Sequence, residues 1–335
     1  MAQPDNVRDC YICGTKLEGN ARSEEHIIPK AIGGRLRSFA LLCKKCNNGL
    51  GEALDSELSG QLLPLANFLA IERERRETPS IHVVFNGKQY IRKADGNMSP
   101  VDERPIVTED SGSLNYSITT SSLAKARRHL EGLKRRHPSI DVDAAMLAAT
   151  STTTRVEGDT EFAFSGIGGE HALRAIVKIA LGYFLHVGGS PLDVPDAIAT
   201  VARSGVPPVE RIGSLYTVDP IPQRDLSRVL HVVAIVTSAS GTQVNAYVEL
   251  LGAVRFAVLL SDSYAGPPIS SAYAFDVCSR EAVAIDAHCL VGAPWAHEDW
   301  PPDDFSREGL IKAVEAVISI ASARNMEAWG PLPGV

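Results

Sequence analysis

The chain has 335 residues and a net charge of −7, with 44% hydrophobic and 22% charged residues, which is typical of a folded globular protein and excludes a disordered or fibrous one. Charged residues interrupt its apolar stretches, so no segment predicts a membrane span. The first ten residues lack the basic and apolar regions of a signal peptide, and we expect a cytoplasmic protein.

The charge is unevenly distributed along the chain. Residues 1–50 contain eight Lys/Arg and five Asp/Glu, a net charge of +3, so the remaining residues carry −10. The net charge alone argues against a nucleic-acid partner, whereas a small basic region on an acidic chain favours one.

The N-terminal elements form a compact, cysteine-rich unit over residues 10–60. Its helix begins near Asn47, with Leu50, Leu54 and Leu58 on one face. Residues 61–78 are expected to continue as a helix. A hairpin follows over 81–93, where Asn86-Gly87 supplies the turn. The polar residues 94–115 predict a long loop or linker.

The later elements alternate between helices and strands. A basic helix is expected over 121–137, and the apolar periodicity of 170–187 predicts a second, core-forming helix. Residues 230–238, 244–261 and 271–277 predict antiparallel strands, and a last helix spans 306–324 with Asp303 and Asp304 as candidate caps. The fold class is α+β, a small N-terminal unit followed by a larger mixed body whose antiparallel sheet has helices against one face.

Four cysteines form two C-x-x-C pairs in the first fifty residues: Cys10, Cys13, Cys43 and Cys46. Each pair forms a turn that directs two sulfurs to one point, and four thiolates complete the tetrahedral shell of a structural zinc ion. Zinc binding can substitute for a core in so small a unit. The alternative is four free thiols. Cys278 and Cys289 are expected to be buried as small hydrophobic residues.

A further motif lies between and after these pairs. Glu25 and His26 precede Ile27-Ile28-Pro29, and Ser38 begins the segment SFALLCKKCN, which ends at Asn47. Over about residues 8–60 this pattern resembles the HNH endonucleases, in which a ββα-metal motif is often scaffolded by a four-cysteine zinc site. The resemblance covers under a fifth of the chain, but its several fixed spacings make it specific.

The resemblance implies a role for each residue of the motif. Hydrolysis of a phosphodiester needs an activated water and charge neutralisation, which a histidine and one hard cation can supply. His26 corresponds to the general base, and Glu25 and Asn47 to the ligands of a catalytic Mg²⁺ or Mn²⁺. Ser38 replaces the usual asparagine, and Glu25 the usual aspartate. Two alternatives remain open, namely Glu24 in place of Glu25 and Asn48 in place of Asn47. Asp55, on the following helix, either lies on the helix surface or supports a ligand.

Basic side chains, two of them within this motif, are candidates for contact with a nucleic-acid backbone. They are Lys44, Lys45, Arg127, Arg128, Arg135 and Arg136. The alternative for the four arginines is an ordinary solvated helix surface.

We therefore predict two domains, an HNH nuclease domain over 1–60, hereafter the head, and an α+β domain over 61–335, hereafter the body. The predicted function is a metal-dependent endonuclease that cuts or nicks DNA, in a layout known from bacterial defence and mobile-element nucleases. The alternative is a non-catalytic zinc module that binds DNA or protein. The body would serve targeting, sensing or assembly through a protein partner or small-molecule effector, and the sequence leaves the oligomeric state open.

Overall fold

The computed structural model describes residues 9–73, 77–101, 105–110, 113–118, 120, 122–148, 160–203, 211–216, 219–221, 224–285 and 306–329. The chain forms two compact units, one from Met1–Thr78 with Phe164–Val335 and the other from Pro79–Ala163. The first unit thus combines the head with much of the body, and our division after residue 60 stays a prediction. In the described part of the chain, no helix is long and apolar enough to cross a membrane.

The head contributes short strands and helices to the first unit. Its elements and the next helix are η1 (Gly19–Ala21), β1 (Glu25–His26), η2 (Lys30–Ile32), β2 (Arg37–Ser38), α1 (Lys44–Leu50), η3 (Gly51–Asp55), α2 (Ser56–Gln61) and α3 (Leu63–Phe68). β1 and β2 pair antiparallel, and α1, η3 and α2 follow as consecutive helical segments with Leu54 and Leu58 fully buried. The expected helix over 61–78 is wrong in length, because α3 ends at Phe68 and the backbone turns at Ala70 with a φ of 51°.

A tight turn returns the chain from β1 to β2. The amide of Gly34 donates to the Pro29 carbonyl at 3.2 Å. A Cβ atom at Gly34 would lie 2.0 Å from the carbonyl oxygen of Ile28, which is closer than any real contact. Only glycine therefore fits at residue 34, and the turn brings β2 back alongside β1.

The rest of the first unit consists of a sheet and helices. Its elements are α6 (Glu170–His186), η4 (Pro191–Asp193), α7 (Pro195–Ala202), β9 (Ile212–Ser214), β10 (Leu230–Thr237), β11 (Val244–Leu250), β12 (Val254–Ser261), β13 (Ser270–Asp276), β14 (Glu281–Val283) and α8 (Arg307–Trp329). The six strands are antiparallel in the order β14-β13-β10-β11-β12-β9. This confirms the predicted α+β class and its antiparallel sheet.

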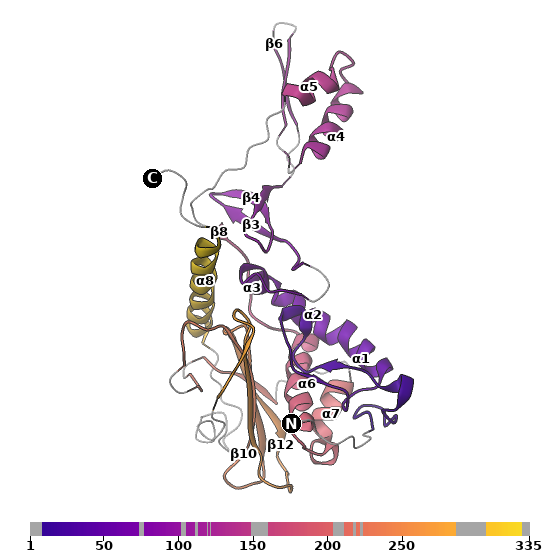
Figure 1. Ribbon diagram of the computed structural model, residues 1–335, viewed down its shortest axis with the longest axis vertical. Helices are drawn as coiled ribbons and strands as arrows, with labels where there is room; N and C mark the ends of the chain where they lie inside the picture. Colours follow the sequence, from indigo (N-terminus) through magenta and orange to yellow (C-terminus); the bar gives the residue numbers. More distant parts are fainter. Residues whose placement is uncertain are drawn as a thin grey trace. The chain divides into compact units, whose positions relative to one another are not determined.

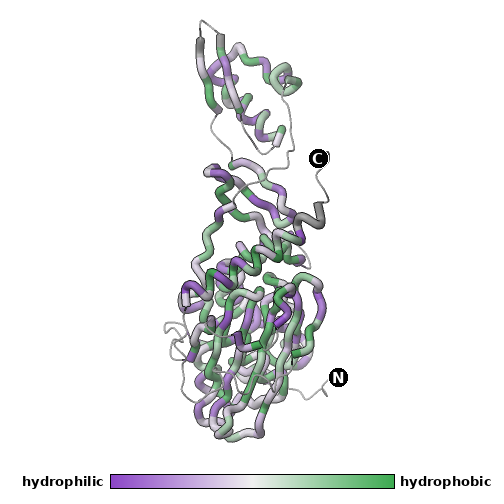
Figure 2. The backbone as a smooth tube through the Cα atoms, turned by 90° about the vertical axis from the view of Figure 1, so that its left-hand side faces the viewer, coloured by the Kyte–Doolittle hydropathy of each residue, from purple (hydrophilic) through white to green (hydrophobic). Residues whose placement is uncertain are grey.

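Both faces of this sheet are covered at its centre. Every residue of β10 and β11 is buried, which explains why these strands are almost continuously apolar. Leu230, Val232 and Ala234 face one core cluster, while the alternate residues of β10 face the other side. Hydrophobic residues accordingly run along the strands of the sheet in Figure 2.

Helix α6 lies between the sheet and the head, as Figure 1 shows. It packs on β10, β11 and β12 and also on η3 and α2. The predicted apolar stripe is present, but residues 174–185 are buried all round the helix. Ile27 of the head lies 3.7 Å from where a Cβ of Gly182 would be, so the apolar residues after His26 pack on this helix.

The described residues of the second unit form two small sheets and two helices. Its elements are β3 (Ile81–Phe85), β4 (Lys88–Arg92), β5 (Met98–Pro100), β6 (Ile106–Asp110), β7 (Ser113–Ser117), α4 (Leu123–Lys134), α5 (Val142–Ala148) and β8 (Thr160–Glu161). One sheet has the order β5-β4-β3-β8, and β6 pairs with β7. Asn86 and Gly87 both have positive φ, as the predicted hairpin turn requires.

One prediction within this unit is wrong. Residues 94–115, expected to be a loop, contain β5, β6 and the start of β7. Val107 and Leu114 pack on a core formed by α4 and α5, with Leu130 and Leu133 buried. Packing of a few apolar residues thus outweighs the polar composition that predicted a loop. The predicted caps Asp303 and Asp304, like Cys289, lie outside the described residues.

Candidate metal centre and active site

The four cysteines of the head converge on one point. The sulfurs of Cys10, Cys13, Cys43 and Cys46 all lie within 4.8 Å of one another, and those of Cys13 and Cys43 are 3.6 Å apart. Sulfurs bound tetrahedrally to zinc at ~2.3 Å would be roughly 3.8 Å apart. The cluster therefore fits a zinc ion, as the spacing of the two pairs predicts.

Local hydrogen bonds shape both turns of this cluster. The amide of Gly14 donates to the Cys10 carbonyl, and Asn47 donates in the same way to Cys43. The Thr15 hydroxyl lies 3.2 Å from the Cys13 sulfur, and this hydrogen bond, together with those from the Thr15 backbone and the neighbouring cysteines, lowers the pKa of Cys13 to about 6. The thiolate form, which binds zinc, is thereby favoured at this position.

The two residues of β1 face opposite sides of the hairpin. Glu25 is buried and pairs with Ser38, whereas His26 is half-buried and pairs with Arg37. This alternation is the ordinary consequence of an extended strand. His26 is consequently partly open to solvent, while the Glu25 side chain points inward.

Asn47 links the first helix to the strand segment. Its Nδ2 atom donates to the Ser23 hydroxyl at 2.8 Å and to the Glu24 carbonyl at 3.0 Å. The start of α1 is thereby fastened to the residues that directly precede Glu25 and His26. All described hydrogen bonds of the Asn47 side chain use its nitrogen, and its Oδ1 accepts none from the described residues.

The Glu25 carboxylate is held by a lysine from the body. Lys178 of α6 donates to Glu25 Oε1 and also lies 3.0 Å from both carboxylate oxygens of Asp55. The side chains of Lys178 and Glu25 are only 1% and 5% exposed. Burial alone would lower the pKa of Lys178, but the carboxylates of Asp55 and Glu25 outweigh it and raise the pKa. Lys178 is therefore a buried ammonium.

The structure also places the alternatives to these residues. Glu24 is exposed, and its carboxylate pairs with Arg37 at 2.9 Å on the surface of the head. Asn48 is exposed. The Ser38 hydroxyl accepts the amide of Ala40 at 3.2 Å, so it fixes the loop that leads to Cys43. Asp55 accepts hydrogen bonds from Lys178 with both carboxylate oxygens, and a supporting role for it at an ion site stays a prediction.

The predicted nucleic-acid contacts lie on the surface. Lys44 and Lys45 are exposed at the start of α1, close in sequence to Asn47. Arg127 and Arg128 are exposed on α4, and Arg135 and Arg136 follow its end. Arg127 already pairs with Asp143 at 2.9 Å. The two groups belong to different compact units.

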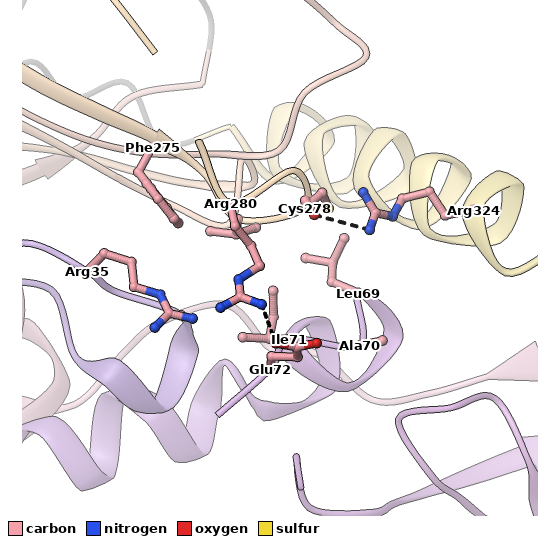
Figure 3. A pocket seen from close by; sticks show the side chains of 11 residues that line it. Arg35, Leu69, Ala70, Ile71, Glu72, Phe275, Cys278, Arg280 and Arg324 are labelled. Atoms are coloured by element: carbon pink, nitrogen blue, oxygen red, sulfur yellow. Dashed lines mark hydrogen bonds and ion pairs between the residues drawn. The ribbon is translucent and has the colours of Figure 1, made fainter. Parts of the chain in front are cut away.

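A separate pocket of about 80 Å³ in the first unit was not expected from the sequence (Figure 3). Arginines from three segments line it: Arg35 after the tight turn, Arg280 between β13 and β14, and Arg324 on α8. Glu72 pairs with Arg280, and Arg324 donates to the Cys278 carbonyl at 3.2 Å. Cys278 is only half-buried, contrary to the expectation of a buried residue.

The cysteine cluster, the strand pair and the following helix together reproduce the arrangement that the sequence motif implies. Residues 10–63 match the HNH endonuclease family. The HNH match covers most of the predicted head and confirms the resemblance found in its motif. It implies that this region binds nucleic acid. No curated protein and no solved structure matches the chain.

Lys178 is the site residue that sequence reasoning missed. It stands 153 residues from Glu25 and outside the HNH match. Its signal was a lysine within an otherwise apolar helix, where a charge must have a partner if the helix is buried. Nothing in the sequence identifies that partner as Glu25.

Proposed function

We propose that the protein is a metal-dependent endonuclease that hydrolyses phosphodiester bonds in DNA through its HNH region. The observation that carries the proposal is the junction of strand and helix: Asn47 is hydrogen-bonded to the backbone beside Glu25 and His26, and four clustered cysteines brace both segments. A structural zinc ion would hold this framework and, with four thiolate ligands, would have no open position for substrate.

In this proposal, His26 acts as the general base. A neutral imidazole takes a proton from water as the water oxygen attacks phosphorus, and the bond from phosphorus to the leaving oxygen breaks. Glu25 and Asn47 offer oxygen atoms, the donors that Mg²⁺ or Mn²⁺ prefers. When bound, such an ion supplies charge neutralisation at the phosphate. The solvent protonates the leaving oxygen.

A second function is favoured by one observation. Because the Glu25 carboxylate already has Lys178 as a buried cationic partner, the head would also be stable as a non-catalytic zinc module that binds DNA or protein. In that case Glu25 would serve the packing of the head on α6, and His26 would have no chemical role.

Cleavage of supercoiled plasmid distinguishes the two functions. We expect zinc-loaded protein to nick or cut the plasmid with Mg²⁺ or Mn²⁺, and His26→Ala to lower the rate by a factor of ~10²–10⁴, the usual contribution of a general base. His82→Ala is the matched control, because His82 is exposed on β3 of the other compact unit. Equal plasmid profiles for wild type and His26→Ala with either metal would leave only the zinc module.

A further inference from the structure

A buried triad of charges connects the body to the head. It consists of Lys178 on α6, Glu25 on β1 and Asp55 at the end of η3. Their side chains are 1%, 5% and 20% exposed, so the triad is largely removed from water. Removing charged groups from water costs free energy that even a well-paired, hydrogen-bonded ion pair offsets only in part, so the triad is not explained by stability alone.

The hydrogen bonds of the triad are unevenly divided between the two acids. Asp55 directs both carboxylate oxygens at the lysine ammonium. Glu25 uses only Oε1, and its other oxygen accepts no hydrogen bond from the described residues. The three donors of Lys178 are thus matched by three oxygens, and one oxygen of Glu25 is left over.

The charges of the triad do not cancel. Two carboxylates and one ammonium leave a net charge of −1 among the three groups. One carboxylate would have been enough to neutralise Lys178. A residual negative charge, an unused oxygen on Glu25 and the unused Oδ1 of Asn47 are conditions that favour a further cation beside Glu25.

We propose that Lys178 is a positioning residue, which holds Glu25 by one oxygen and thereby orients the other toward a divalent ion. This inference rests on the proposed function, since it concerns the same ion site. A glutamate side chain has several rotatable bonds, and an outer partner that fixes its orientation commonly raises metal affinity 10–100-fold. The body therefore completes the ion site, although the HNH match ends before α6.

Binding of Mn²⁺ to the zinc-loaded, full-length protein tests this inference without relying on cleavage. By isothermal titration calorimetry we expect Lys178→Met to bind Mn²⁺ about 10–100-fold more weakly than wild type. Arg174→Met is the matched control: Arg174 is also a buried cation of α6, one turn earlier, but it bonds Glu170 and the carbonyls of Thr200 and Val201. We expect this control to bind Mn²⁺ as wild type does.

A second variant covers the case in which Lys178→Met does not fold. Lys178→Met/Asp55→Asn removes one positive and one negative charge, so it keeps the net charge of the triad while losing the contact to Glu25. We expect it to fold and still to bind Mn²⁺ weakly. Binding as strong as wild type in a folded Lys178 variant, or stronger, would overturn the positioning role.

These outcomes separate this inference from the proposed function. If wild type binds Mn²⁺ and Glu25→Gln abolishes that binding, but Lys178→Met does not change it, only the role of Lys178 is wrong. If wild-type protein binds no Mn²⁺, the ion site itself is wrong and both proposals fail.

Discussion

Acidification should destabilise the first compact unit through one buried histidine, His231 of β10. This side chain is fully buried, its Nε2 lies 2.8 Å from the Ile32 carbonyl, and its Nδ1 accepts the amide of Leu251 at 3.2 Å. Since a carbonyl only accepts, Nε2 carries the proton and the ring is neutral. The bond to Ile32 fastens the head to the central strand of the sheet.

The magnitude follows from the pKa of this histidine. Burial lowers the pKa of His231 from 6.5 to about 4. Between pH 6.5 and about 4, His231 is therefore protonated in the unfolded chain but stays neutral in the folded protein. The neutral histidine gives its full contribution to stability above pH 6.5 and loses it as the pH falls. The loss approaches ~1.4 kcal/mol per pH unit and reaches about 2 kcal/mol at pH 5.

The assay is urea unfolding of wild type and His231→Gln between pH 7.5 and 5, with zinc present. Glutamine can donate and accept hydrogen bonds but does not titrate. We expect the variant to be less stable at pH 7.5 and the difference from wild type to shrink by about 2 kcal/mol at pH 5. His171→Gln, an exposed position on the first turn of α6, is the control and should parallel wild type. Parallel loss of stability in wild type and His231→Gln would refute the reasoning.

Two further predictions concern metal and nucleic acid. Metal analysis should find one zinc per chain, and Cys43→Ser should lose the zinc and have a lower melting temperature. Cys278→Ser, outside the cluster, is the control and should keep both the zinc and the melting temperature of wild type. Metal-free wild type with a folded head would contradict the zinc site. Replacing Arg127, Arg128, Arg135 and Arg136 by Gln should reduce the slope of log K against log salt for DNA binding by about 3 in magnitude. Each neutralised phosphate contributes roughly 0.9 to this slope, and Arg127 is not counted because it already pairs with Asp143. Arg228→Gln is the control, because Arg228 already pairs with Asp225. An unchanged slope in the four-arginine variant would mean that the basic face of α4 is a solvated surface that does not contact DNA.

The cysteine cluster and the HNH motif could be predicted because their information is local. Two C-x-x-C turns, an acid-histidine pair before Ile27-Ile28-Pro29 and an asparagine after the last cysteine determine ligand types and spacing within a short segment. The same holds for the Asn86-Gly87 turn, for α6 and for the strands of the antiparallel sheet, where periodicity and turn residues act over a few positions. Polar composition failed for residues 94–115, because contacts of Val107 and Leu114 with α4 and α5 decide their structure.

Only the tertiary structure decided which residues share the environment of Glu25. The sequence determined that Glu25 follows the pattern of a metal ligand and that Lys178 interrupts an apolar helix, but it could not pair them. Their contact forms because α6 is buried between the sheet and the head, so its lysine must find carboxylates on whichever element packs against it. Ion pairing depends on distance and burial in the folded chain, and neither is encoded in the spacing of residues 153 positions apart.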